Sequence, residues 1–190
     1  MCTCAETYDF IVSKAEELPE SGTKFDIVTA AGVVQWVDRD LFLKKLGHVM
    51  SDHGYLLIYD FWISDQMKDC PAYTTWFHDA YLKEFPKPFR NESVWTEKDV
   101  EPYGFLMKDQ IQHEMEYAFD QDSFIEFMMI QSNVNARIEG GENSVKTVRK
   151  WFKQTTAPLF QGEKRTVLFA GYSWYMKLQS KSRQSIAAPV

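Results

Sequence analysis

Long apolar runs, cysteines and early glycines are all scarce in this chain of 190 residues. No apolar run approaches the roughly 20 residues that a membrane-spanning helix needs, so we expect no membrane protein. The three cysteines are too few, and odd in number, for a disulfide framework, which favours a reducing compartment. The start, MCTCAETYDF, has neither the basic segment nor the apolar stretch of a signal peptide. These absences together predict a cytoplasmic protein.

An excess of basic residues and the common catalytic signatures are also lacking. The chain has 21 basic and 27 acidic residues, a formal net charge of −6, which disfavours non-specific binding to nucleic acids or anionic membranes. Its four histidines lack the spacing of metal ligands, so we expect no metal. There is no GxSxG nucleophile elbow and no phosphate-binding Walker loop. Composition is that of one domain with a sizeable core, since 45% of the residues are hydrophobic.

The most informative pattern lies in the first third of the chain and predicts a βαβ unit. Residues 25–29 read as a strand of apolar and β-branched residues, and the small residues 30–32 follow directly. Apolar residues then recur at helical spacing over 41–50, which predicts a crossover helix. Residues 51–54 read as a turn, and 55–59 as a short buried strand of the kind found in parallel sheets.

This stretch resembles the central part of a class I S-adenosylmethionine-dependent methyltransferase. FDIVTAAGVVQWVD, which begins at Phe25, is followed by FLKKLGHVMSDHGYLLIYDFW, which ends at Trp62. The order of strand, small-residue loop, Gln-Trp pair, helix and turn is most similar to the small-molecule subgroup that includes the trans-aconitate methyltransferases. The resemblance runs roughly from Tyr8 to Leu178. It implies a Rossmann-like α/β sheet with a helical, aromatic insertion and an antiparallel last strand.

The resemblance also implies S-adenosylmethionine as the cofactor, bound by two loops. VSKAEELP, at 12–19, resembles the family's loop near the adenine, which implies Ser13, Lys14, Ala15 and Glu16 as cofactor residues. The end of the first predicted strand implies Thr29, Ala30, Ala31 and Gly32, since small residues let a ligand lie close to the backbone. Glu17 is an alternative to Glu16, although exposed carboxylates beside a proline turn are equally common without a role.

A substrate pocket is expected to use Gln35, Trp36, Asp60, Trp62, Trp76 and Ser132. Gln35 stands where many relatives carry histidine, and glutamine can only form hydrogen bonds, so it cannot act as a base. We interpret Trp36 as a packing residue in the pocket floor. Asp60 is expected at the carboxyl end of the second strand, where doubly wound sheets bind ligands. No catalytic residue is assigned with certainty.

The chain departs from the family at its beginning. Class I methyltransferases open with a strand and a GxGxG loop, and this chain has no glycine before Gly22. The first two strands therefore have no counterpart, and the prediction is an N-terminally truncated domain without its main cofactor loop. We expect residues 1–179 to form this partial domain, with an insertion or lid at 63–109, and 180–190 to form a disordered tail.

The region after Trp62 is rich in aromatic residues. Trp76, Phe77, Tyr81 and Phe85 share one face of a helix expected between Asp69 and Glu84. One interpretation is a helix buried against the sheet. The other is a lid over a small-molecule pocket, because such clefts are commonly lined by aromatic side chains.

The remaining pattern alternates strands and helices. It predicts a strand over 110–119, a helix that is capped by Asp122-Ser123 and ends before Gly140, a helix from Ser144 towards Thr156, and a final strand over 165–178. The resemblance implies that the final strand lies at the edge of the sheet. MMIQSNVNARI resembles a family helix with a Thr-x-Ser core, which implies that Ser132 faces the substrate.

The implied reaction is direct transfer of a methyl group to a nucleophilic oxygen, nitrogen or carbon of a small molecule. It requires donor and acceptor in line with water excluded, so no catalytic triad is expected. In the closest subgroup the acceptor is a carboxylate. A second hypothesis is a non-catalytic remnant that binds a protein partner, or itself, through the sheet edge left by the missing strands. A different nucleotide-binding α/β enzyme, such as half of a dehydrogenase, is disfavoured by the absence of a phosphate loop.

Overall fold

A computed structural model describes residues 10–19, 22–90 and 94–180, so all but the first residue of the expected tail lies outside the described residues. The elements are η1 (Ala15–Glu17), β1 (Phe25–Ala31), α1 (Arg39–Val49), β2 (Met50–Met67), α2 (Ala72–Trp76), η2 (Phe77–Tyr81), α3 (Leu82–Glu84), α4 (Glu97–Val100), η3 (Glu101–Tyr103), β3 (Phe105–Phe119), α5 (Gln121–Met129), α6 (Ser132–Glu139), α7 (Val145–Phe160) and β4 (Arg165–Leu178). Within the described ranges, no helix has the length and apolar character to cross a membrane.

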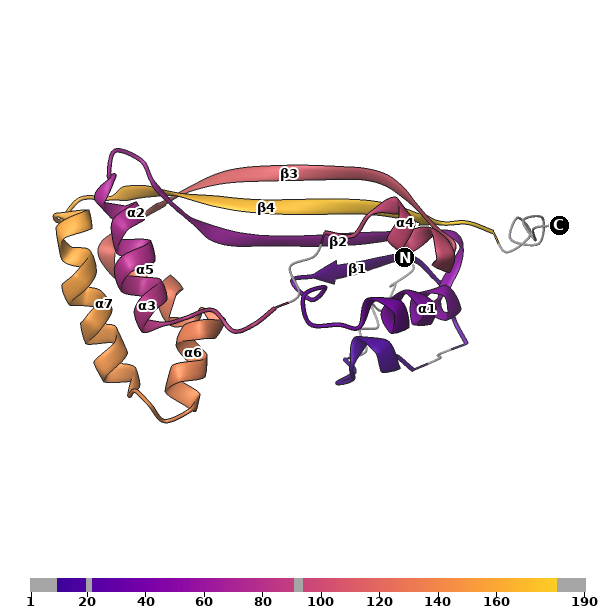
Figure 1. Cartoon of the computed structure of the whole chain (residues 1–190), viewed down its shortest axis with the longest axis horizontal. Coiled ribbons are helices and arrows are strands. Elements are labelled where there is room, and N and C mark those ends of the chain that lie inside the picture. The colour runs from indigo at the N-terminus through magenta and orange to yellow at the C-terminus, as the bar shows by residue number, and fades with distance from the viewer. Residues whose placement is uncertain (1–9, 20–21, 91–93, 181–190) are drawn as a thin grey trace, which may run out of the picture. The chain divides into compact units, whose positions relative to one another are not determined.

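One mixed sheet contains the strands in the order β1-β2-β4-β3. β1 and β2 run in the same direction with α1 as their connection, whereas β4 runs against both of its neighbours (Figure 1). This confirms the predicted Rossmann-like α/β class. The prediction that the final strand lies at the edge is wrong, because β3 pairs with its outer side. β4 itself covers 165–178, as predicted.

The chain divides into two compact units, and each of the three long strands contributes residues to both. Unit 1 comprises Met1–Ile58, Glu92–Asp109 and Trp174–Val190, and unit 2 comprises Tyr59–Asn91 and Gln110–Ser173. The expected extent of the partial domain, with its insertion at 63–109, stays a prediction.

Unit 1 is built on the predicted strand and helix. The Asp38 carboxylate caps α1 by accepting a hydrogen bond from the Leu41 N–H at 3.0 Å. α1 buries Phe42, Leu43, Leu46 and Val49 along one side, which is the periodicity seen in the sequence. β1 is different, because Ala30 is its only buried residue.

β2 is longer than predicted. Its 18 residues begin at Met50, so the segment 51–54, predicted as a turn, belongs to the strand. A local irregularity remains there, since His53 has a φ of 68°. The strand also continues past its expected end at Tyr59, because alternating burial resumes at Ile63 and Met67. Asp60 therefore lies inside the strand and not at its carboxyl end.

Unit 2 has an aromatic core between its helices and its part of the sheet. α2, the π-helical turn η2 and α3 follow one another as the predicted helical segment. Trp76, Phe77, Tyr81 and Phe85 are all buried in this core. The structure thus shows the first of the two interpretations, a buried helix.

The predicted helix after β3 is two helices, α5 and α6, which separate at Ile130 and Gln131. The cap of α5 is Asp120, and the prediction of Asp122-Ser123 is wrong by two residues. The Asp120 carboxylate accepts the Ser123 N–H at 2.8 Å, and the Ser123 hydroxyl accepts the Asp120 N–H at 3.1 Å. The helix predicted to begin at Asn143-Ser144 is α7, and Ser144 is its cap, with the hydroxyl accepting the Thr147 N–H at 3.1 Å.

Candidate functional site

Two segments with predicted cofactor residues approach each other at the start of α1. The Glu16 carboxylate accepts a hydrogen bond from the Asp38 N–H at 2.8 Å. Asp38 caps α1, and η1, which contains Ala15 and Glu16, contacts that helix. The structure therefore joins the segment 13–16 to the loop that leads from β1 into α1.

The side chains around η1 mainly serve local contacts. The Ser13 hydroxyl donates to the carbonyl oxygens of Lys14 at 3.0 Å and Glu17 at 3.2 Å. The Lys14 ammonium lies 3.2 Å from the Glu17 carboxylate, in an exposed ion pair of little energetic value. What this segment offers to a ligand is therefore chiefly its exposed backbone.

The end of β1 has the small residues and the open backbone expected of a ligand site. Ala30 is buried, whereas Thr29 and Ala31 are exposed. Gly32 has a φ of 61°, in the left-handed region where a β-carbon is strained. The turn at Gly32 therefore favours glycine.

The Gln35–Trp36 pair lies in the loop that follows. The Trp36 N–H donates to the Val33 carbonyl at 2.9 Å, which closes a turn. Val34 fills the interior position of this loop, and Gln35 is half-buried. Trp36 is 55% exposed, and its role in a pocket floor stays a prediction.

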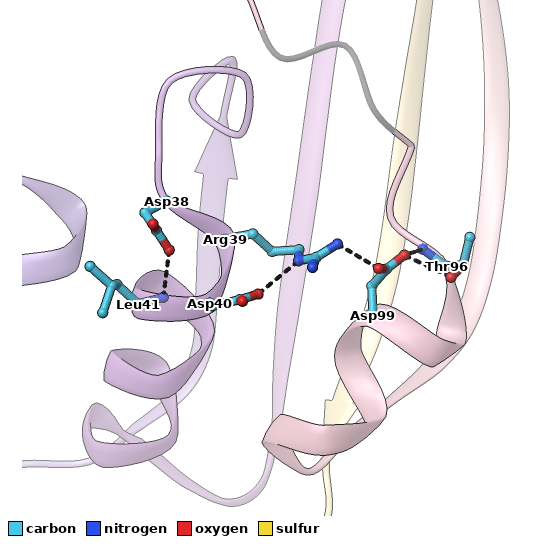
Figure 2. A network of polar contacts seen from close by, with 6 residues as sticks. All are labelled: Asp38, Arg39, Asp40, Leu41, Thr96 and Asp99. Carbon is cyan, nitrogen blue, oxygen red and sulfur yellow. Dashed lines mark hydrogen bonds and ion pairs between the residues drawn. The ribbon is translucent and has the colours of Figure 1, made fainter.

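A polar network fixes the start of α1 to α4 within unit 1 (Figure 2). The Arg39 guanidinium lies 3.0 Å from Asp40 and 2.5 Å from Asp99. Asp99 also accepts hydrogen bonds from the Thr96 hydroxyl at 2.7 Å and the Thr96 N–H at 2.8 Å. These Thr96 contacts, followed by the charge of Arg39, lower the pKa of Asp99, while the bond to Asp40 raises the pKa of Arg39. The network holds the loop end of α1 in a defined place.

In unit 2, Asp60 and Trp62 lie with Tyr172 on β2 and β4. The Trp62 and Tyr172 rings have centroids 6.1 Å apart. Burial, and then the charge of Asp60, raise the pKa of Tyr172 to about 12. Tyr172 therefore stays a neutral hydrogen-bonding phenol at physiological pH.

Trp76 lies in the aromatic core and not at a pocket, which corrects its assignment to the substrate site. It is 7% exposed and stacks on Tyr81 with an interplanar angle of 12°. Its indole N–H has no hydrogen-bond partner in the part of the chain that the structure describes. Packing, rather than contact with a ligand, accounts for its position.

Ser132 lies at the first position of α6, where the Arg90 guanidinium donates a hydrogen bond to its hydroxyl at 2.7 Å. The neighbouring Asn133 is buried, accepting from the Tyr81 hydroxyl at 3.0 Å and donating to the Phe85 carbonyl at 2.6 Å. Ser132 thus lies beside a buried polar pair. The predicted site residues divide between the units, with 13–16, 29–32, Gln35 and Trp36 in unit 1 and the other four in unit 2.

Comparison with known proteins concerns the part of the chain that contains the first of these groups. Residues 2–58, less than half of the chain, match the family model described as a methyltransferase domain. This segment is similar to part of a methyltransferase domain. The match confirms the resemblance predicted from the sequence, and S-adenosylmethionine is the cofactor that goes with such a domain. No curated protein matches the chain significantly.

Several solved structures are similar to the chain. One is from Anaeromyxobacter dehalogenans and is provisionally described as a type II methyltransferase. It is 17% identical with a TM-score of 0.58, over 90% of this chain and 71% of that one. The YcgJ protein of Bacillus subtilis is 15% identical, and the match covers 88% of this chain and 70% of YcgJ, with a TM-score of 0.46. A provisionally described methyltransferase from Bacillus halodurans is 14% identical, and the match covers 88% of this chain and 70% of that chain, with a TM-score of 0.43. The first of them shows the methyltransferase fold, and at these identities no more than the fold.

Sequence reasoning missed two features of the methyltransferase segment and its neighbours. The Glu16–Asp38 contact joins residues 22 positions apart, and no local sequence pattern predicts it. Tyr172 was overlooked although it lies in the correctly predicted final strand. Its pairing with Trp62 depends on strand order, which the sequence did not supply.

Proposed function

We propose that this chain carries the central part of an S-adenosylmethionine-dependent methyltransferase that acts on a small molecule. The observation that carries the proposal is the family match over residues 2–58, which includes η1, β1 and α1. The cofactor would lie against the segments 13–16 and 29–32. The hydrogen bond between Glu16 and Asp38 supports this placement, because it holds the two loops together.

S-adenosylmethionine supplies an activated methyl group when it is bound, so the protein has to hold the acceptor in line and exclude water. We propose a carboxylate as the acceptor and a methyl ester as the product. A carboxylate is already a nucleophile at neutral pH and needs no base, which is compatible with glutamine at position 35. Gln35 in unit 1 is one proposed substrate contact. Asp60, Trp62 and Ser132 are proposed separately as contacts within unit 2, where Asp60 and Trp62 would act beside Tyr172.

We further propose that the 190-residue chain binds the cofactor weakly and turns over slowly, or not at all, because it contains no GxGxG loop. The backbone at Gly32 would then make most of the contacts that bind S-adenosylmethionine. Its φ of 61° suits glycine, as does the φ of 74° at Gly22 outside the site. The two glycines therefore form a matched pair for substitution.

The test is a calorimetric titration of S-adenosylmethionine into the whole chain, followed in parallel by amide chemical shifts. We expect a dissociation constant above about 10 μM, and shifts at residues 13–16 and 29–32. Gly32→Ala should weaken binding at least about fivefold, whereas Gly22→Ala, with similar backbone strain, should not. A folded sample that shows neither heat nor shifts at millimolar cofactor would refute cofactor binding by these loops.

A second candidate function is association through β1, which one observation favours. In the described part of the sheet β1 pairs only with β2, and its Ile27 side chain is 67% exposed. An apolar strand with an open edge is a template for pairing with another chain. Sedimentation should show self-association that Ile27→Lys abolishes and that Ile130→Lys, at a residue 69% exposed outside the strands, leaves intact. A monodisperse monomer would exclude this candidate.

We place the protein in the cytoplasm and expect no nucleic-acid partner. The proposal rests on the three cysteines and the net charge of −6. Fractionation of cells that express the chain would test the location, and a gel-shift experiment at low salt would test the second expectation.

A further inference from the structure

Unit 1 contains a cleft of about 340 Å³ that none of the proposed cofactor or pocket residues lines. Leu43, Lys44, Gly47 and His48 of α1 form one wall, Pro102 and Tyr103 form another, and the end of β4 closes it. This volume lies at the lower end of the range for small-molecule sites. The cleft lies at the last turns of α1, whereas the predicted cofactor loops meet the first turn of that helix.

The walls of the cleft are held by contacts on both sides. The Arg39–Asp99 ion pair joins α1 to α4, directly before the segment that carries Pro102 and Tyr103 (Figure 2). Burial, and then the nearby Asp40 carboxylate of α1, raise the pKa of Tyr103. At the end of β4, the Gln179 N–H donates to the Gly104 carbonyl at 2.8 Å. These contacts shape a site before any ligand arrives, which reduces the entropic cost of binding.

The lining combines an apolar wall with a polar rim that carries a lysine. The exposed Pro102 and the half-buried Tyr103 ring provide accessible apolar surface, whereas Leu43 and Leu178 are buried behind it. Lys44 and His48 are exposed one turn apart on α1, so their side chains are neighbours on the helix surface. Among the residues that the structure describes, no acidic residue lines the cleft.

The Lys44 ammonium at the rim is not neutralised by the protein, since among the described residues it takes part in no hydrogen bond or ion pair. The Lys24 ammonium donates to the His48 carbonyl at the end of α1. A second cation therefore lies near the rim and offsets the partial negative charge of the helix terminus.

From this arrangement we propose that the cleft binds a small organic anion, with a flat apolar body against Pro102 and the Tyr103 ring and a carboxylate at Lys44. The site is separate from the proposed methyl-transfer site. It adds a second binding function to the chain, and its ligand would contact the last turn of α1.

The test uses the whole chain with 2-naphthoate and the isosteric neutral 2-naphthamide, followed by amide chemical shifts. We expect saturable shifts at Gly47, His48 and Gly104, and affinity for naphthoate at least about tenfold higher than for naphthamide, because only the carboxylate makes charge-assisted hydrogen bonds. Lys44→Gln should remove most of this preference. Lys98→Gln, at an exposed lysine of α4 that does not line the cleft, should leave it unchanged.

Filling the cleft provides an independent check. A β-carbon at Gly47 would meet no heavy atom within 4 Å, so Gly47→Leu should fold and occupy the cleft, whereas Gly47→Ala should not fill it. We expect Gly47→Leu to lose binding of both naphthalenes and Gly47→Ala to keep it. Equal affinity for the two compounds, shifts confined to other surfaces, or unaltered binding by a folded Gly47→Leu variant would each overturn the proposal.

Discussion

Unit 1 contains the segment 2–58 that matches the methyltransferase-domain model but exposes much of its first strand, whereas unit 2 contains the large aromatic core and no family match. In unit 1, β1 buries only Ala30 and leaves Phe25 and Ile27 exposed. In unit 2, a single cluster buries aromatic side chains from helices and strands alike, among them Phe85, Phe124 and Phe152. Recognisable sequence and packing density are therefore properties of different parts of this molecule.

The difference has a physical basis. The motif in unit 1 consists of small residues and an open turn, which suit close approach of a ligand but contribute little buried area. Aromatic residues in unit 2 each bury a large area and contact one another edge-on or stacked, which stabilises the fold. We expect stability to reside mainly in unit 2 and ligand binding in unit 1.

Matched phenylalanine substitutions should give the largest contrast. Phe152 is fully buried and stacks on Phe85 at 5.4 Å, so Phe152→Ala should cost about 3–5 kcal/mol of unfolding free energy. Phe25 in β1 is 47% exposed, and Phe25→Ala should cost about 0.5 kcal/mol or less. Urea unfolding measures both. Similar losses for the two variants would show that β1 is buried in solution, for example in an oligomer.

Alkaline pH should act on unit 2 through its buried tyrosines. Burial raises the pKa of Tyr81 to about 12, partly offset by its hydrogen bond to Asn133 and the charge of Arg90, and burial also raises the pKa of Tyr73. The folded state thus holds these protons more tightly than the unfolded state, whose tyrosines titrate near pH 10. Stability is fully present below pH 10 and is lost as pH rises towards 12, by about 1.4 kcal/mol per pH unit for each tyrosine.

The measurement is the unfolding free energy between pH 8 and pH 12, for the parent chain and for Tyr81→Phe. The substitution should flatten the decline by about 2 kcal/mol over the range from pH 10 to pH 12, because one titrating group is removed. Parallel pH profiles would mean that Tyr81 does not carry this linkage.

Replacing either of two glycines by alanine should change the stability of the fold in opposite directions. At Gly171 in unit 2 a β-carbon would lie 2.7 Å from the Asp60 carbonyl oxygen, so Gly171→Ala should destabilise the fold by about 1–3 kcal/mol. At Gly47 in α1 the space is open, and Gly47→Ala should stabilise by up to about 1 kcal/mol through helix propensity. The measurement is the urea midpoint of each variant, which should fall for Gly171→Ala and rise for Gly47→Ala. A lower midpoint for Gly47→Ala would contradict the open space around Gly47.

Local signals explain what the sequence predicted well. The prediction was almost correct for four elements, β1, α1, α7 and β4. Strand composition, helical periodicity and a helix start at Asn143-Ser144 can be recognised from residues that are close together in the sequence. The length of β2 and the interior position of β4 were missed, since both depend on pairing between distant strands. The cap of α5 was misplaced because Asp120 and Asp122 are both plausible capping residues, and only the geometry at Ser123 selects the first.

The candidate site shows the same division. The small residues after β1 and the turn at Gly32 could be predicted, because they follow from the strand itself. The burial of Trp76 and the exposure of Trp36 could not, since a tryptophan at helical spacing or in a loop suits either environment. The contact of Arg90 with Ser132 joins residues 42 positions apart and required the folded chain.

The interior position of β4 has a consequence for the order in which the protein can form during synthesis. β4 is the last of the four strands in sequence order, yet it separates β2 from β3 in the sheet. Until β4 has left the ribosome, β2 and β3 each present an unpaired strand edge to the cell, and such edges attract other nascent chains. Loss of β4 would leave β2 and β3 without the strand that joins them. Nascent chains of this protein should therefore depend on chaperones at least until Leu178 has emerged from the ribosome.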